Sequence, residues 1–404
     1  MKRVASLFIL AACLAMSCMK HEADFAETGA FKVLSVKLTD VALADGTLNP
    51  DVQLMGDEGP DTKLAVTSID YLVSDLLGCV MSNSLIHISG TYLGRDIDGS
   101  PLTLSGKLLI PRDGAIKNMV IVSHYTIGSN RECPSESFPL EGILAAKGYA
   151  VVMADYIGYG VTVQRIHPYM HVFSTASSVI DMALAVKPYL ESIGRKPESE
   201  EVYLMGYSQG GSTTLGVMRE IQRYYSDRLP VRKVFAGGGP YDLAATYDTA
   251  MEEDHTDIPC AIPMIVQGIN EGEHLGLDLA DFFQPKLLEN YREWINSKQY
   301  TVGEIDKLIG ARALSEIMTP TGRDRTSPKT ASLYRALMFN SVLNFIPAYP
   351  IYLFHSMDDG TVPFINAMRA EEYFKGRDIT FDFGHYGPHG MGAVYFITSV
   401  ARQL

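Results

Sequence analysis

The sequence EVYLMGYSQGGSTTLGVMR, residues 201–219, decides the fold of this chain. Residues 202–205 form a short apolar run with β-branched and aromatic members, which predicts a buried strand. Residues 206–210 follow at once and read Gly-Tyr-Ser-Gln-Gly. Helix-compatible sequence then continues to residue 225. A strand, a tight turn and a helix are therefore predicted in direct succession, with Ser208 in the turn.

The residues around Ser208 fit a turn that exposes a serine hydroxyl. Such a turn brings backbone close to the positions two residues before and after the serine, and Gly206 and Gly210 suit them because they lack a Cβ. The G-x-S-x-G pattern alone is weak in a chain with 35 Gly among 404 residues. The flanking strand and helix make it a predicted nucleophile elbow, in which the backbone N–H of Gln209 faces the same space as the hydroxyl.

Strand-like and helix-like segments alternate on both sides of this turn. Residues 85–93 and 102–110 predict an antiparallel hairpin, because residues 94–100 between them have turn chemistry. Further along, apolar strands alternate with helices, which predicts an α/β fold with a mostly parallel central sheet covered by helices on both faces. The other strands are expected at residues 31–38, 119–123, 149–154, 202–205, 232–236, 349–355 and 379–383, and the helices at 141–147, 174–192, 211–225, 364–374 and 391–402.

The alternation stops between residues 240 and 348, where the pattern is mostly helical. The main helices of this segment are expected at residues 275–295 and 302–317. The segment follows the sixth strand, counted from residue 85, at the edge of the sheet where ligands bind in open α/β folds. We therefore expect residues 240–348 to form a helical cap over the site.

A serine hydroxyl is a poor nucleophile at neutral pH, so a base and an orienting carboxylate are expected near Ser208. In this type of sheet the acid follows the strand after the cap, and the histidine follows the last strand. Asp359, two residues before Thr-Val-Pro, is preferred to its neighbour Asp358 as the acid. His389, between a proline and a glycine, is preferred to His385 as the base.

The chemistry of such a serine also needs backbone N–H donors for a developing oxyanion. Gln209 supplies one candidate, and the second is expected after the first parallel strand, in the sequence SHYTIG at residues 123–128. Tyr125 stands where a glycine is common, so the amide of either Tyr125 or Thr126 is expected to serve. His124 is expected to bond nearby backbone. His167 and His171 are expected to pack, with a place in the lining of the site as the alternative.

These stretches together resemble the α/β-hydrolase superfamily, and within it the secretory lipase-like esterases. The resemblance extends from about residue 85 to the end of the chain. Beyond the predicted catalytic residues it is carried by HYTIG (124–128), CPS (133–135), DYIGYG (155–160), HPY (167–169), GYSQGG (206–211), GPYDL (239–243) and Val362-Pro363. The resemblance implies hydrolysis of a small-molecule carboxylic ester through a Ser-His-Asp triad and an acyl-enzyme, with no metal and no cofactor.

Two other functions fit the same motifs. A prolyl-type serine peptidase uses the same chemistry, but such enzymes usually carry a large N-terminal domain, which residues 1–60 are too few to form. A surface binding protein that keeps the fold without catalysis is the second alternative. The presence of Ser208, Asp359 and His389 together argues against it, because a binding module has no need of all three.

The N-terminus predicts export. Lys2 and Arg3 precede an apolar run, residues 4–16, that is too short for a stable membrane span. A small residue before Cys18 resembles a bacterial lipoprotein signal, with Cys18 lipidated; Cys13 and a plain secretory peptide are the alternatives. The expected parts are a signal at residues 1–17, a tether at 18–60 and a hydrolase domain at 61–404. Such a protein lies in the cell envelope and contacts the membrane only through its lipid anchor.

Charge and cysteine content narrow the choice of partners. The formal net charge is −13 at pH 7 and is spread without acidic blocks, which argues against nucleic acid as a partner. Cys79, Cys133 and Cys260 follow the signal, and their odd number allows at most one internal disulfide. A buried free thiol is at least as good an interpretation for each. The sequence makes no prediction of the oligomeric state.

Overall fold

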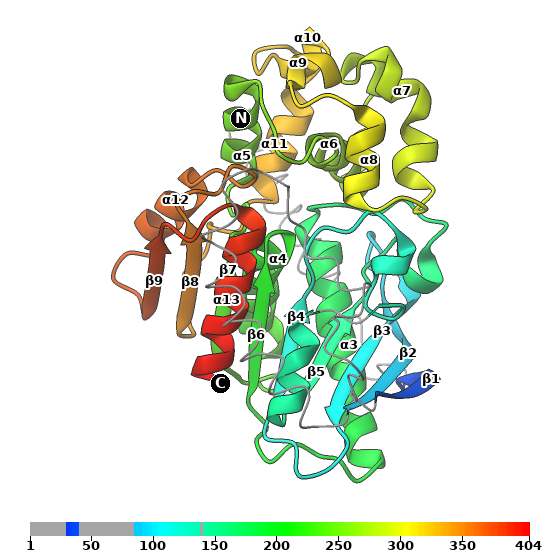
Figure 1. Cartoon of the computed structure of the whole chain (residues 1–404), viewed down its shortest axis with the longest axis vertical. Helices are drawn as coiled ribbons and strands as arrows, with labels where there is room; N and C mark the ends of the chain where they lie inside the picture. The colour runs from blue at the N-terminus through cyan, green and yellow to red at the C-terminus, as the bar shows by residue number, and fades with distance from the viewer. Residues whose placement is uncertain (1–29, 40–84, 138–139) are drawn as a thin grey trace, which may run out of the picture.

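Helices flank both faces of one β-sheet in the computed structural model, which describes residues 30–39, 85–137 and 140–404 (Figure 1). Within these ranges the sheet has nine strands in the order β1-β2-β3-β5-β4-β6-β7-β8-β9. The pairs β1–β2, β2–β3 and β3–β5 are antiparallel, and the pairs from β5–β4 to β8–β9 are parallel. The strands are β1 (Lys32–Thr39), β2 (Leu85–Arg95), β3 (Pro101–Pro111), β4 (Met119–Ser123), β5 (Ala150–Ala154), β6 (Val202–Tyr207), β7 (Val231–Gly237), β8 (Ile351–Ser356) and β9 (Ile379–Gly384).

Alternate side chains of the strands pack into separate cores on the two faces of the sheet. On β7, Val234 and Ala236 belong to one core and Phe235 to the other, as the two-residue period of a strand requires. The first core includes residues of α3 (Val172–Ser192), α4 (Gln209–Glu220) and α12 (Ile365–Tyr373). The second includes residues of η2 (Leu140–Lys147) and α13 (His389–Gln403). The predicted fold class, a mostly parallel sheet with helices on both faces, is confirmed.

The chain between β7 and β8 forms a helical layer, at the top of Figure 1, with an apolar core of its own. This core also takes in Tyr169 and Met170 from the loop before α3, so it attaches the layer to the rest of the molecule. We call residues 240–348 the cap. Its elements are α5 (Leu243–Glu253), α6 (Ala261–Gly272), η5 (Leu279–Asp281), α7 (Pro285–Tyr291), η6 (Arg292–Asn296), α8 (Val302–Ile309), α9 (Leu314–Ile317), α10 (Pro320–Arg323) and α11 (Ala331–Phe339).

The two helices predicted inside the cap are wrong in their extent. The expected helix at 275–295 begins only at Pro285, because Gly276 is left-handed (φ 66°) and the backbone turns at η5 before the proline starts α7. The expected helix at 302–317 ends as α8 at Ile309, since Gly310 adopts φ 70° and caps it. Short pieces follow instead of a continuous helix.

The remaining predicted elements are found near their expected places. The hairpin of β2 and β3 is confirmed, and the strand expected at 31–38 is β1, which pairs with β2. That part of the expected tether therefore belongs to the sheet, and with β1 counted the cap follows the seventh strand. α13 starts at His389, two residues earlier than predicted. The other short helical turns are η1 (Asn130–Glu132), η3 (Gly160–Thr162) and η4 (Ile221–Tyr225), the last with π-helical geometry.

The predicted signal peptide, Cys13, Cys18 and Cys79 lie outside the described residues. Within the described ranges, no helix is both long enough and apolar enough to pass through a lipid bilayer.

Close packing of α6 on the loop before α3 predicts a sensitive position at Gly268. A Cβ there would lie 2.3 Å from the backbone nitrogen and 2.4 Å from the carbonyl oxygen of Tyr169, and neither atom is free to move aside. We expect Gly268→Ala to lower the free energy of unfolding by about 1–3 kcal/mol through overpacking. Denaturant unfolding of the purified native protein and of Gly268→Ala measures this difference in the free energy of unfolding.

Gly303, in α8, supplies the matched control. A Cβ at this position would meet nothing within 4 Å. Gly303→Ala should therefore be neutral or stabilise the protein by up to about 1 kcal/mol, because alanine is the better helix former. Equal unfolding midpoints for both variants would contradict the predicted contact between the cap and the loop.

Candidate active site

Ser208 occupies a sharp turn between β6 and α4. Its φ of 59° and ψ of −127° lie in a region that residues with a Cβ rarely adopt, so the turn is strained. Hydrogen bonds hold the turn on both sides, since Ser208 N donates to Gly237 O (2.9 Å) and Gly211 N donates to Ser208 O (2.9 Å). The hydroxyl is left at the carboxyl end of the parallel strands.

The two flanking glycines are required by close backbone contacts. A Cβ on Gly206 would lie 2.3 Å from Gly210 O, and a Cβ on Gly210 would lie 2.0 Å from Ser123 O. Both distances are far below any real carbon–oxygen contact, so only glycine fits either position. The predicted reason for the G-x-S-x-G spacing is confirmed.

The structure brings the three predicted catalytic residues into one hydrogen-bonded chain. His389 Nε2 lies 2.8 Å from Ser208 Oγ, and His389 Nδ1 lies 2.6 Å from Asp359 Oδ2. Ser208 and Asp359 are both buried, at 8% and 7% relative exposure. Because a carboxylate only accepts, Nδ1 carries the proton in this arrangement and Nε2 is free to accept one from the serine.

Asp359 is held as an anion by its surroundings. Burial by itself raises the pKa of this carboxyl, but His389 and the other nearby donors outweigh burial and hold the pKa below its ordinary value. The second oxygen, Oδ1, accepts the backbone N–H groups of Thr361 (2.9 Å) and Val362 (2.8 Å). The Thr-Val-Pro sequence after Asp359 therefore supplies the amides that orient the carboxylate.

The competing residues form a separate pair on the surface. His385 Nδ1 lies 2.7 Å from Asp358 Oδ1, with the two side chains 74% and 39% exposed. Asp358 Oδ2 also accepts the backbone N–H of Gly387 (3.1 Å). This second His–Asp pair braces the loop that precedes α13.

Two side chains that support the hydrogen-bonded series of Ser208, His389 and Asp359 could not be found from sequence patterns. The Tyr207 hydroxyl donates to the carbonyl oxygen of His389 (2.8 Å), which ties the end of β6 to the start of α13. His355 Nε2 donates to Val362 O (3.0 Å) and lies 3.7 Å from Asp359 Oδ2. Burial lowers the pKa of His355, so this histidine is neutral behind the carboxylate. The Tyr207 contact joins residues 182 positions apart, so no local signal marks it. The His355 contact spans only seven residues, but it lies in a turn that no periodic pattern describes.

Of the three predicted oxyanion residues, Gln209 and Thr126 line the pocket and Tyr125 does not. Thr126 and Gln209 line the same pocket as Ser208, and Thr126 Oγ1 lies 2.6 Å from the Tyr169 hydroxyl. The side chain of Tyr125 packs instead against a small cluster that contains Ile127.

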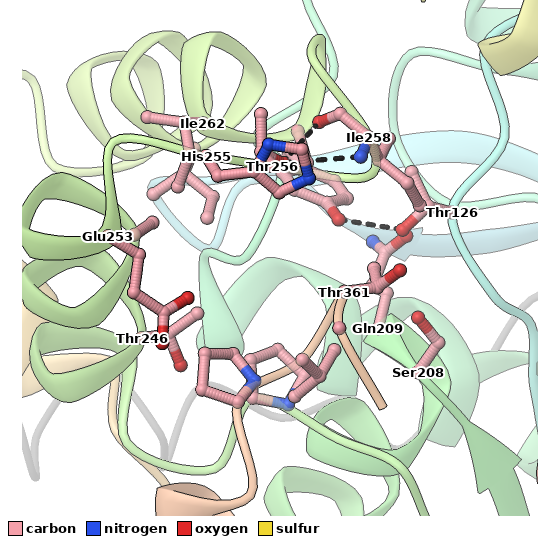
Figure 2. Close-up of a pocket in the computed structure, with 18 residues that line it drawn as sticks. Thr126, Ser208, Gln209, Thr246, Glu253, His255, Thr256, Ile258, Ile262 and Thr361 are labelled. Carbon is pink, nitrogen blue, oxygen red and sulfur yellow. Dashed lines mark hydrogen bonds between the residues drawn. The ribbon is translucent and has the colours of Figure 1, made fainter. Parts of the chain in front are cut away.

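The pocket above Ser208 is closed by the cap. Figure 2 shows Ser208, Gln209 and Thr126 on one side and Glu253, His255 and Ile262 across the pocket from Ser208. The exposed Glu253 and His255 side chains lie at its rim. Apart from Pro240 at its start, the cap contributes apolar lining residues from α5, α6 and the loop between them: Ala250, Ile258, Ala261, Ile262 and Ile265.

Other reactive groups are few in the described part of the chain. Cys133 and Cys260 are buried free thiols, and burial raises the pKa of both. The described residues contain no group of three or more His, Cys, Asp and Glu side chains placed to hold a metal ion.

The depressed pKa of Asp359 predicts a pH-dependent stability. Its contribution to the free energy of unfolding is complete above the unfolded pKa, about 3.9, and is lost as the pH falls through the lower, folded pKa. We expect the stability of the native protein to fall more steeply below about pH 4 than that of Asp359→Asn. Denaturant unfolding at a series of acidic pH values measures both slopes.

Asp358→Asn is the control, because solvent screens its exposed carboxylate and its removal should change the slope less. The same slope in Asp359→Asn and in the native protein would contradict the predicted linkage.

Comparisons with known proteins agree with this geometry. The profile of the secretory lipase family matches residues 135–390, more than half of the chain. No curated protein sequence matches the chain significantly.

Similar solved structures include the rice cell wall degrading esterase LipA from Xanthomonas oryzae (23% identity, TM-score 0.70, covering 84% of this chain and 94% of that one). A putative hydrolase from Legionella pneumophila has 22% identity and a TM-score of 0.71 (83% and 94% covered). Lipase A from Candida antarctica has 16% identity and a TM-score of 0.57 (76% and 73% covered). These likenesses show the α/β-hydrolase fold.

The match to the secretory lipase family identifies the family of this chain, and the fold agrees with it. Its description as a family of secretory lipases indicates an exported protein that hydrolyses carboxylic esters. The chain belongs to the secretory lipase family.

Proposed function

We propose that this protein is an exported serine carboxylesterase with Ser208 as nucleophile, His389 as general base and acid, and Asp359 as the orienting carboxylate. The observation that carries the proposal is the connected path from Ser208 Oγ to His389 Nε2 (2.8 Å) and from His389 Nδ1 to Asp359 Oδ2 (2.6 Å). These are the distances that proton transfer between a serine and its base requires.

The reaction proceeds in two halves. Ser208 Oγ attacks the ester carbonyl carbon while its proton passes to His389 Nε2, and the carbonyl oxygen becomes an oxyanion. His389 returns the proton to the leaving alcohol, which leaves an acyl-enzyme on Ser208. Water then loses a proton to His389 and attacks the acyl carbon, and the proton returns to Ser208 as the carboxylic acid departs.

The amides of Gln209 and Thr126 bind the oxyanion in this proposal. His124 Nδ1 lies 2.7 Å from Tyr125 O, which fixes the peptide unit between Tyr125 and Thr126. In a trans peptide the N–H points opposite to the C=O, so the Thr126 N–H faces away from His124. Thr126 also lines the pocket with Ser208, which supports its amide over that of Tyr125.

The mature protein is proposed to be lipid-anchored through Cys18, after removal of residues 1–17, with a hydrolase domain that comprises β1 (Lys32–Thr39) as well as residues 61–404. A positive start, a short apolar run and a small residue before Cys18 support the anchor. The proposed substrate is a small-molecule ester, and the apolar side chains of α5 and α6 that line the pocket over Ser208 support it.

Ser208→Ala tests the nucleophile. We expect it to abolish hydrolysis of a short-chain nitrophenyl ester and labelling by a fluorophosphonate, while the unfolding midpoint stays near the native one. Native protein should be labelled and should cleave esters faster than peptides. Undiminished turnover by Ser208→Ala would overturn the assignment. Native protein that does not react with the fluorophosphonate would favour a binding function.

The two neighbouring aspartates provide a matched test of the acid. We expect Asp359→Asn to lower kcat by about 10⁴-fold, because the wrong imidazole tautomer would then face Ser208. Asp358→Asn should leave kcat within about threefold, since its carboxylate contacts His385 on the surface. Steady-state ester hydrolysis decides between them, and a larger loss in Asp358→Asn would reverse the assignment.

A further inference from the structure

We propose that His167 is a positioning residue for the oxyanion donor at Gln209, an inference that rests on the proposed function. His167 Nε2 lies 3.2 Å from Nε2 of the Gln209 side chain amide. His167 is far from Ser208 in sequence and belongs to the loop between β5 and α3. Its ring contacts the residue that directly follows the nucleophile.

The hydrogen-bond partners of His167 fix its tautomer. Nδ1 lies 2.7 Å from Ile157 O, and a carbonyl oxygen only accepts, so Nδ1 carries the proton. A neutral imidazole has one N–H, which leaves Nε2 as an acceptor. The Gln209 amide must therefore present its NH₂ group to His167, and its carbonyl oxygen faces away.

Burial keeps His167 in this neutral form. The side chain is 5% exposed, and burial, followed by the positive charge of Lys298, lowers its pKa to about 3. Lys298 itself is buried, with its ammonium group 5.3 Å from the centre of the Tyr159 ring. His167 therefore stays a hydrogen-bond acceptor for Gln209 throughout the neutral pH range.

Packing holds the imidazole in place. The rings of Tyr156 and His167 are nearly parallel, 6.1 Å apart, and Tyr159 and Tyr169 pack on His167 at 5.0 and 5.9 Å. Gly158 adopts φ 96°, and a Cβ there would lie 2.6 Å from His167 Cα. The backbone on which His167 sits is thus in close contact with the loop of residues 155–160.

The hydrogen bond between His167 and the Gln209 side chain acts on the peptide unit that joins Ser208 to Gln209. The carbonyl oxygen of this unit accepts Gly211 N (2.9 Å) and Ser212 N (3.3 Å), and its N–H is the proposed oxyanion donor. Ser208 at φ 59° strains one end of the unit. The Gln209 side chain, 1% exposed although it lines the pocket, anchors the other end on His167. Loss of that anchor frees the N–H to leave the direction that the transition state needs.

Two substitutions at His167 separate this role from a merely structural one. His167→Gln places an amide oxygen near the position of Nε2 and keeps an acceptor for Gln209, but loses the donor to Ile157. His167→Asn places an amide nitrogen near Nδ1 and keeps that donor, but loses the acceptor. Each variant gives up one buried hydrogen bond, so their unfolding midpoints should be similar.

Kinetics with a short-chain nitrophenyl ester give the readout. We expect His167→Asn to lower kcat by about 10- to 100-fold with KM within about threefold, because the lost interaction matters in the transition state. His167→Gln should retain kcat within about threefold of native. Gln209→Leu should lower kcat like His167→Asn, and the double variant should lose little more, because both break one contact.

The outcomes are distinguishable from failure of the proposed function. Native protein that neither hydrolyses the ester nor reacts with a fluorophosphonate would overturn the proposed function and this role with it. If native protein is active and the Asn and Gln variants lose kcat equally, or if the losses at residues 167 and 209 are additive, the positioning role alone is wrong. For variants of low stability, the rate of fluorophosphonate labelling per folded molecule replaces kcat.

Discussion

The structure depends on a close approach of backbone at the turn that carries Ser208. Gly210 packs its Cα against the carbonyl oxygen of Ser123, so the start of α4 lies directly beside the end of β4. This contact limits how α4 can leave the sheet, and Ser208 at the start of the helix has a strained φ of 59°. The cost of the strain is met by the hydrogen bonds of the turn and by the apolar packing of α4 against the sheet. A side chain at Gly206 or Gly210 would collide with backbone and displace Ser208.

His389, the proposed base, reaches Ser208 from the other end of the chain. α13 packs along one face of the sheet, with Phe396 in the same core as Phe354, and its first residue is His389. Tyr207, next to Ser208, donates a hydrogen bond to the carbonyl oxygen of His389, and a Cβ on Gly392 would lie 2.5 Å from the Tyr207 hydroxyl. The position of the imidazole is therefore set by sheet packing and by the strand that carries the serine.

The sequence predicts what is local and misses what acts through space. Buried strands such as β4 are continuous apolar runs, and the order of strand, turn and helix around Ser208 is written in adjacent residues. The cap is harder to predict, because most residues of α6 are buried in a core that the cap forms by itself, and because Gly310 ends a helix that the sequence pattern would continue. His167 contacts Gln209, which lies 42 residues away in the chain, so no spacing rule indicates that contact.

The lining of the pocket has an uneven origin. The residues that close it from above lie within one stretch of the cap, from Thr246 to Ile265, whereas Ser208 and its immediate neighbours belong to the sheet and its loops. Variation confined to that single stretch would alter the shape and polarity of the pocket without disturbing the turn that carries the serine. Substrate preference can therefore change through substitutions in the cap while the turn around Ser208 stays the same.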